Sequence, residues 1–476
     1  MGKKAAKKEV DKCDVWWWLT DGRCVVSFLC IAIFALLVRV GVSFHPYSGA
    51  GNPPKYGDYE AQRHWMEITL NTASREWYRN STTNDLLYWG LDYPPLTAYQ
   101  SYVHALFLNY FHLDSVALFT SRGHESPLGK LLMRWTVLSA DALIFFPAVL
   151  CFIWIYYTGR RSGYKEGITW HLAMILVSPC LILIDHGHFQ MSAYFAPAFF
   201  SRLLGKCFKR RYPLLEVSKL GLTVMGTFAL IWWPYLYSTE AFMEVISRLA
   251  PFERGLFEDY VANFWCTTSV LIKWKKLFTT QSLKLLSLSA TVLSILPSMV
   301  QQIMSPSDQG FLYALLNSSF AFYLFSFQVH EKSILLPLLP ASLLALEEPL
   351  LFKWFTFYAM FSMYPLLCRD HLILPYMALL ALFLFIYYSP GGRQGGREVY
   401  LPKWAQIVMS LHLLCSVLLH LIYLTFRPPE KYPFIFEAMI MLLCFSQFIL
   451  ITVYTNTKQW RLLNSLTWMD KEKKLV

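Results

Sequence analysis

The sequence predicts an all-α protein that crosses a membrane many times. Its 476 residues are 55% hydrophobic and only 15% charged, whereas about a quarter of the residues of a soluble domain are charged. Apolar stretches near the ~20 residues that a helix needs to cross the hydrocarbon layer recur along most of the chain. These observations exclude an ordinary soluble domain and predict about twelve membrane spans.

The predicted spans cover residues 24–44, 131–157, 168–185, 191–205, 217–238, 285–304, 310–329, 333–349, 350–368, 371–388, 405–425 and 433–455. Basic residues cluster before the first span and in the segments 160–165, 206–211 and 393–403. All of these fall on one side if the N-terminus is cytosolic, as the positive-inside tendency expects. The net charge of +11 therefore needs no nucleic-acid partner. The even number of spans predicts that both termini are cytosolic.

One apolar stretch, 261–274, does not fit this pattern, because it is short and is followed by Lys275 and Lys276. The segments 252–259 and 328–332 lie together on the side opposite the cytosol only if this stretch does not cross. We therefore expect it to be re-entrant or interfacial, although its lysines then run against the positive-inside tendency.

The loop between the first two spans, residues 45–130, is long enough to carry function. It begins with YGDYEAQRHW (56–65), in which a helix would place Asp58, Gln62 and Trp65 on one face. The segment 88–111 is amphipathic after the break at Pro94-Pro95, so we expect it to lie along the membrane interface. Asn80 opens an Asn-Ser-Thr glycosylation sequon.

The acidic and aromatic cluster suits sugar chemistry. A carboxyl group that aromatic residues desolvate at the membrane surface can act as a base, and aromatic faces beside polar groups match a sugar ring. Further polar groups on the same predicted side are Asp92 and the segments 185–190, 253–259 and 328–333. The alternative is a solvated amphipathic helix with incidental charges. Ionisable groups that gather beside hydrocarbon are costly, which favours a functional site.

Other chemistries find little support in the sequence. Walker A, GxGxxG and nucleophile signatures are absent. The spacing of His186 and His188 points the two rings apart in a helix, and no metal-binding motif appears, so we expect no metal site. The ten cysteines lie mostly in apolar runs without zinc spacing. The first apolar run lacks a clear cleavage site, so we expect it to be a retained anchor.

The motifs PYSGAGNPP, YGDYEAQRHWMEIT, WGLDYPPLTAY, TSRGHES, LILIDHGHFQ, ERGLFED and YLFSFQVHEKSILL occur in this order. The chain thereby resembles, over nearly its whole length, the dolichyl-phosphate-glucose-dependent alpha-1,3-glucosyltransferases of the endoplasmic reticulum. These are GT-C-type membrane enzymes of N-glycan precursor assembly. The resemblance is closer to the enzyme that adds the first glucose than to its paralogue that adds the second.

This resemblance implies that glucose passes from dolichyl phosphate glucose to a terminal mannose of the lipid-linked nine-mannose oligosaccharide, with inversion and without a cofactor. Asp58 occupies the position of the catalytic base. For the leaving phosphate the first candidate is His330, followed by Arg254 and Lys332. The residues assigned to substrate binding are Glu60, Arg63, Trp65, Asp92, His188, Gln190, Arg254, Glu258, His330 and Lys332.

The chain departs from the family pattern at 190/191, where Gln190 is joined directly to Met191. Roughly 35 residues are missing there, about enough for two minimal crossings, so the parity of the topology is kept. A shortened, inactive form is therefore one alternative. A second is a non-catalytic lipid-binding or transport protein, although transporters tend to show repeated halves and we find no internal repeat.

The predicted organisation has a cytosolic tail (1–23), a GT-C catalytic module with its lumenal loop (24–258), a C-terminal membrane module (259–455) and a second cytosolic tail (456–476). The final Lys473-Lys474-Leu475-Val476 resembles the dilysine retrieval signal of endoplasmic reticulum membrane proteins. The expected partners are the two dolichol-linked substrates and the bilayer, with the active site facing the lumen.

Overall fold

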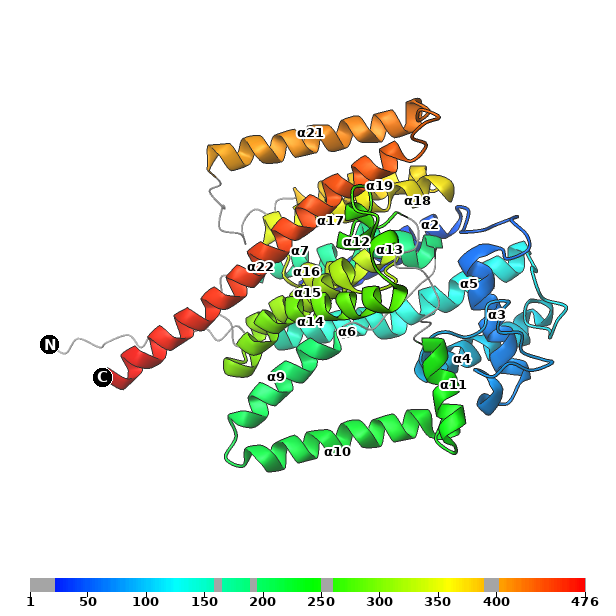
Figure 1. Cartoon of the computed structure of the whole chain (residues 1–476), viewed down its shortest axis with the longest axis horizontal. Coiled ribbons are helices and arrows are strands. Elements are labelled where there is room, and N and C mark those ends of the chain that lie inside the picture. The colour runs from blue at the N-terminus through cyan, green and yellow to red at the C-terminus, as the bar shows by residue number, and fades with distance from the viewer. Residues whose placement is uncertain (1–21, 158–164, 189–194, 250–259, 389–401, 476) are drawn as a thin grey trace.

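The computed structural model describes residues 22–157, 165–188, 195–249, 260–388 and 402–475. Every regular element in these residues is a helix, which confirms the predicted all-α class (Figure 1). The helices are α2 (Gly22–Ser43), α3 (Gly57–Asn71), α4 (Pro95–Phe111), α5 (Pro127–Ala140), α6 (Phe146–Tyr157), α7 (Lys165–Leu176), α8 (Pro179–Leu183), α9 (Ala196–Phe208), α10 (Pro213–Trp232), α11 (Thr239–Leu249), α12 (Phe264–Thr268), α13 (Trp274–Leu277), α14 (Thr280–Met304), α15 (Asp308–Phe325), α16 (Leu335–Leu343), α17 (Pro349–Ser362), α18 (Tyr364–Arg369), α19 (Ile373–Tyr387), α21 (Lys403–Thr425) and α22 (Ile435–Leu475).

Seven helices in the described part of the chain are long and apolar enough to cross a membrane. They cover Val26–Ser43, Pro127–Tyr157, Gly167–His186, Pro213–Tyr235, Thr280–Met304, Lys403–Thr425 and Ile435–Leu462, and each coincides with a predicted span. The other five predicted spans correspond to shorter or broken helices: α9, α15, α16, the pair α17 and α18, and α19. The total of twelve therefore stays a prediction.

The core of the bundle surrounds α15, which packs against α14, α16, α22 and α9. Most side chains of α15 are buried, including the polar Asn317, Ser318 and Ser319. By contrast, α10 and α21 lie along the outside of the bundle (Figure 1) and expose apolar side chains such as Leu230 and Leu421. Exposed apolar faces of this kind suit contact with lipid.

The stretch 261–274 forms no spanning helix, as the sequence predicts. It contains the five-residue helix α12 and ends where the four-residue helix α13 begins. Because an α-helix rises 1.5 Å per residue, neither is long enough to cross the hydrocarbon layer.

The C-terminal helix is longer than the predicted span 433–455. Helix α22 continues without a break to Leu475, and the point at which the cytosolic tail begins stays a prediction. Gln459 lies near the end of the apolar part of α22, Ile435–Leu462, and its side chain is buried in the core. Its side chain exchanges hydrogen bonds with Ser298, Gln301 and Asn317 at 2.6–3.0 Å. This polar contact joins α22 to α14 and α15.

The Gln459→Leu variant should lower the free energy of unfolding by about 1–3 kcal/mol, because Asn317 and Ser298 would lose partners while buried. Equilibrium unfolding in mixed detergent measures the change. The Gln406→Leu variant, on the exposed side of α21, is the matched control and should unfold like the parent chain. Equal stability of the two variants would mean that this network does not hold α22 in place.

Candidate active site

Asp58 lies in the first turn of α3, and a tight backbone approach fixes where that helix begins. Gly57 has a φ of +68°, and a Cβ atom there would lie 2.4 Å from the carbonyl oxygen of Ser48. Only glycine fits such a position without strain. An acidic side chain at a helix N-terminus is also favoured by the helix dipole. The sequence thus sets both the place and the environment of this carboxylate.

Asp58 forms an ion pair with Lys332 across 274 residues of sequence. Lys332 Nζ donates to Asp58 Oδ2 at 2.6 Å; the lysine side chain is 3% exposed and that of the aspartate 25%. Lys332 belongs to the short 3-10 turn Glu331–Ile334 before α16. The structure therefore brings together two of the predicted site residues from distant parts of the chain.

His330 precedes this turn and is 24% exposed. Its Nδ1 atom lies 3.0 Å from Glu331 Oε2, within ion-pair distance although without the angles of a hydrogen bond. Glu331 Oε1 also accepts a hydrogen bond from Arg369 Nη2 at 3.3 Å. The predicted residues His330 and Lys332 thus flank a buried carboxylate and lie at the same end of the bundle as Asp58.

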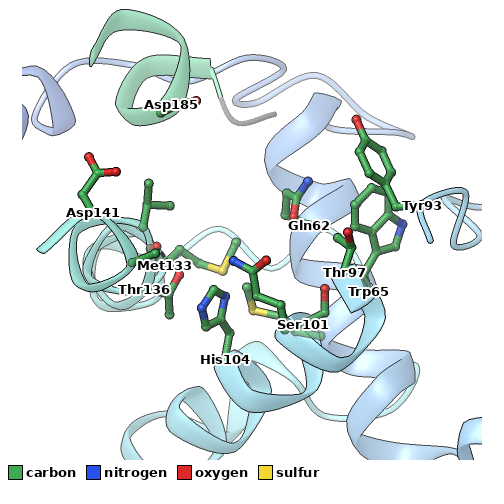
Figure 2. Close-up of a pocket in the computed structure, with 14 residues that line it drawn as sticks. Gln62, Trp65, Tyr93, Thr97, Ser101, His104, Met133, Thr136, Asp141 and Asp185 are labelled. Atoms are coloured by element: carbon green, nitrogen blue, oxygen red, sulfur yellow. Dashed lines mark hydrogen bonds between the residues drawn. The ribbon is translucent and has the colours of Figure 1, made fainter. Parts of the chain in front are cut away.

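A cavity of about 140 Å³ begins one helical turn beyond Asp58. It is lined by Gln62, Trp65, Met66, Tyr93, Thr97, Gln100, Ser101, His104, Met133, Thr136, Val137, Ala140, Asp141 and Asp185. Figure 2 shows Gln62 and Trp65 on one side of it and Met133 and Thr136 on the other. Trp65 Nε1 donates to the Trp89 carbonyl at 2.9 Å, which fixes the indole. The predicted helix is confirmed, and its Gln62 and Trp65 both line this cavity.

A charge cluster inside the membrane spans forms one end of the cavity. Asp141 starts a π-helical turn between α5 and α6, and its Oδ2 atom accepts from Arg39 Nε at 2.5 Å and lies 2.9 Å from His186 Nε2. Arg39 also donates to the Leu176 carbonyl at 2.8 Å. Our sequence analysis missed Arg39 and Asp141, although ionisable residues within apolar spans are usually functional or paired.

The predicted substrate-binding residues Glu60 and Arg63 lie elsewhere, on the opposite face of α3. Arg63 donates to both oxygens of Glu60 at 2.7 Å and to Glu67 at 2.8 Å, and all three side chains are buried. Burial alone would raise the pKa of Glu67, but the hydrogen bond from His64 and the charge of Arg63 outweigh it and lower the pKa to about 2. These contacts are internal to the protein and do not reach the cavity.

The remaining predicted residues are placed as follows. Asp92 is half-buried in the loop before α4 and is not among the residues that line the cavity. His188 ends the π-helical turn Ile184–His188, but its side chain lies outside the described residues, as do Gln190, Arg254 and Glu258 entirely. Asn80 is exposed.

Within the described residues, no three His, Cys, Asp or Glu side chains are arranged to hold a metal ion. The expected independence of metals stays a prediction.

The chain matches the model of the ALG6, ALG8 glycosyltransferase family over residues 29–192 and 190–454. The two matched stretches meet at the predicted gap. An Arabidopsis thaliana protein, named a probable dolichyl pyrophosphate Man9GlcNAc2 alpha-1,3-glucosyltransferase, is 58% identical over 97% of this chain and 95% of its own length.

Two more distant relatives carry the same name without the word probable. The Gallus gallus protein is 40% identical over 89% of this chain and 94% of its own length. The Saccharomyces cerevisiae protein is 35% identical over 92% of this chain and 91% of its own length. Because the family model matches residues 29–192 and 190–454 and the relatives are similar over about nine-tenths of the chain or more, the chain belongs to the ALG6, ALG8 family of glycosyltransferases.

Proposed function

We propose that the chain transfers glucose from dolichyl phosphate glucose to a terminal mannose of dolichyl-diphosphate-linked Man9GlcNAc2, at the lumenal face of the endoplasmic reticulum membrane. The names of its relatives support the acceptor and the alpha-1,3 linkage. The observation that carries the proposal is the ion pair between Asp58 and Lys332, one helical turn of α3 before Gln62, which lines the cavity. A base and a phosphate-binding cation are what this reaction needs.

The reaction is a single displacement. The mannose hydroxyl oxygen bonds to C1 of glucose while the bond between C1 and the phosphate oxygen breaks, and the configuration inverts. Asp58 takes the hydroxyl proton as general base. The leaving group is dolichyl phosphate, whose charge is already delocalised over its oxygens. It therefore needs a cation or hydrogen-bond donors rather than a general acid.

Lys332 has two roles in this proposal. In the chain without substrate its ammonium group neutralises Asp58 at 2.6 Å, and a carboxylate paired in this way is a poor proton acceptor. When the donor binds, its phosphate competes for the ammonium group, which frees Asp58 to accept the mannose proton. Donor binding would thereby activate the base. His330, two residues away and partly exposed, is a second donor for the phosphate.

We place the acceptor mannose in the cavity. A cavity of about 150 Å³ holds one benzene-sized ring, so a volume of about 140 Å³ suits a single ring. Trp65 and Tyr93 offer aromatic faces, and Gln62 and Gln100 offer amide groups for sugar hydroxyls. Glu60 and Arg63 do not contact the sugar in this proposal; they hold α3 in the orientation that presents Asp58.

The deciding experiment reconstitutes the purified chain in liposomes with dolichyl phosphate glucose and lipid-linked Man9GlcNAc2, and reads the size of the oligosaccharide. We expect an increase of one glucose, with or without EDTA. The same assay is run on a version in which the stretch missing at 190/191 is restored from a relative. Transfer only by the restored chain would identify this form as inactive, and transfer by neither would favour a non-catalytic lipid-binding protein.

The His330→Ala variant should raise the KM for dolichyl phosphate glucose by about tenfold, because a hydrogen bond to a charged group is worth about 1.5–3 kcal/mol. The KM for the acceptor should not change. Initial rates at varied donor concentration measure the effect, with His112→Ala as control because that ring bonds Ser115 outside the cavity. An unchanged donor KM would assign the phosphate to Lys332 without His330.

The lumenal position of the loop 45–130 predicts that Asn80 is glycosylated. Asn80 and Thr82 of the sequon are exposed, whereas Asn317, which also opens a sequon, is buried within α15. Treatment of microsomal protein with a peptide N-glycosidase should increase its electrophoretic mobility, and Asn80→Gln should remove that shift. A parent chain that carries no glycan at Asn80 would contradict this part of the proposal, as would a persistent shift in the variant.

A further inference from the structure

A basic segment on the proposed lumenal side is left unexplained by the catalytic site. We name residues 264–284 the lysine hook. It contains α12, α13 and the start of α14, and it carries Lys273, Lys275, Lys276 and Lys284. The first three are exposed and the fourth is half-buried. Four lysines on the lumenal side run against the positive-inside tendency, so a specific reason for their presence is needed.

Aromatic contacts hold the lysine hook in a fixed shape. Trp274 Nε1 donates to Thr268 Oγ1 at 2.8 Å, which closes the hook on itself. The ring of Trp274 packs against Trp265 with centroids 5.5 Å apart, and Trp265 Nε1 donates to the Phe325 carbonyl at 2.7 Å. The hook is therefore anchored to the end of α15 rather than trailing in solvent. A preorganised set of charges binds an anion with less loss of entropy than a flexible one.

The lysine hook and the active site lie at the same end of the bundle. The hook leads into α14, and the next helix, α15, packs against α14. Helix α15 ends at Phe325, just before the segment that carries His330 and Lys332. Lys284 Nζ lies 5.9 Å from the ring centroid of Phe327, only five residues before Lys332. Because a chain extends by at most about 3.6 Å per residue, the Cα atom of Phe327 lies within roughly 18 Å of the Cα atom of Lys332. Figure 1 shows α12 and α13 beside α14 and α15.

The surface of the hook is both basic and apolar. Val270, Leu271, Leu277 and Phe278 are exposed next to the lysines. This combination is typical of segments that lie in the membrane interface, with apolar side chains in the acyl region and cations at the headgroups. The ligand that it fits is therefore an anion attached to a lipid tail, held at the level of the headgroups.

We propose that the lysine hook binds the diphosphate of the lipid-linked acceptor. This inference rests on the proposed function and adds to it a second anion site. The donor phosphate must lie at the reaction centre, beside Asp58 and Lys332. The acceptor, however, carries its diphosphate at one end and its reacting mannose at the other. A cationic site on the same membrane face, set apart from the reaction centre, matches that separation. The diphosphate also carries more negative charge than ordinary phospholipid headgroups.

The test measures lipid binding and does not depend on glucose transfer. The parent chain and a Lys273→Gln, Lys275→Gln, Lys276→Gln variant are placed in phosphatidylcholine nanodiscs and titrated with undecaprenyl diphosphate. We expect the variant to bind at least about tenfold more weakly. An arginine variant at the same three positions should bind like the parent. The matched control changes Lys206, at the end of α9, and Lys209 and Arg210, between α9 and α10, to glutamine, and should bind normally.

Titrations with undecaprenyl phosphate and phosphatidylserine separate the possible ligands. A selective loss of diphosphate binding supports the proposal. Equal losses for phosphatidylserine would make the hook a general contact with anionic lipid and overturn it, as would unchanged diphosphate binding by the glutamine variant. A loss shared by the arginine variant would point to packing rather than charge and would also overturn it. Because binding is read directly, these outcomes stand apart from a failure of the chain to transfer glucose.

Discussion

The Asp58→Asn variant should transfer glucose at least about a hundred times more slowly than the parent chain, because a general base contributes a factor of roughly 10² to 10⁴. Asparagine keeps the shape of the side chain, and its oxygen can still accept a hydrogen bond from Lys332. It cannot take the proton of the attacking hydroxyl. The rate is measured in liposomes with donor and acceptor both saturating, so that a change in binding does not hide the loss of chemistry.

Two measurements separate this loss from unfolding. Thermal unfolding should show that the purified variant is folded at the assay temperature, although the buried Lys332 loses its counter-charge and some stability with it. The Asp114→Asn variant, at an exposed position in the same loop, should retain the full rate. If Asp58→Asn keeps more than about a tenth of the parent rate while it is folded, the base lies elsewhere in the site and the mechanism above is wrong.

The Arg63→Met variant should lose about 3–5 kcal/mol of folding stability, which is the usual cost of removing one partner from a buried ion pair. Arg63 is fully buried between Glu60 and Glu67 and also donates to the Ser115 carbonyl at 3.0 Å. Its removal leaves the buried carboxylates of Glu60 and Glu67 without the positive charge that neutralises them, inside the loop that carries Asp58. Equilibrium unfolding in mixed detergent measures the change.

The matched control for this variant is Arg79→Met. Arg79 pairs with Glu244 at 3.0 Å, but both side chains are well exposed, and exposed ion pairs contribute little. Arg63→Lys should recover only part of the lost stability, since an ammonium group cannot reproduce the planar fork of guanidinium. Equal stability of Arg63→Met and Arg79→Met would show that the buried network does not support the loop.

Helix α3 shows which side-chain positions the sequence alone could predict and which it could not. Asp58, Gln62 and Trp65 follow helical spacing, and that spacing correctly predicts that Gln62 and Trp65 share a face. The same rule separates Glu60 and Arg63 from this face, because they are two and five residues from Asp58. Their assignment to substrate binding came with the family resemblance and stays a prediction. Spacing alone would have favoured internal contacts with Glu67.

Pairings between distant segments were beyond the sequence. Asp58 and Lys332 were each predicted as site residues, but nothing in the local pattern says that they form an ion pair across 274 residues. Arg39 and Asp141 each interrupt an apolar span, which is a usable signal for a buried partner. Their mutual contact and that with His186 depend on how α2, α5 and the turn Ile184–His188 pack, which is a property of the tertiary fold.

The position of α15 has a consequence for biogenesis. This enclosed helix is not among those apolar enough to cross a bilayer on composition alone, and its Asn317 bonds Gln459, which is 142 residues later in the chain. At a translation speed of about 5–20 residues per second, roughly 7 to 28 s pass before that partner emerges from the ribosome. Until then Asn317 lacks this partner. We therefore expect the insertion of α15 to depend on the helices made before it.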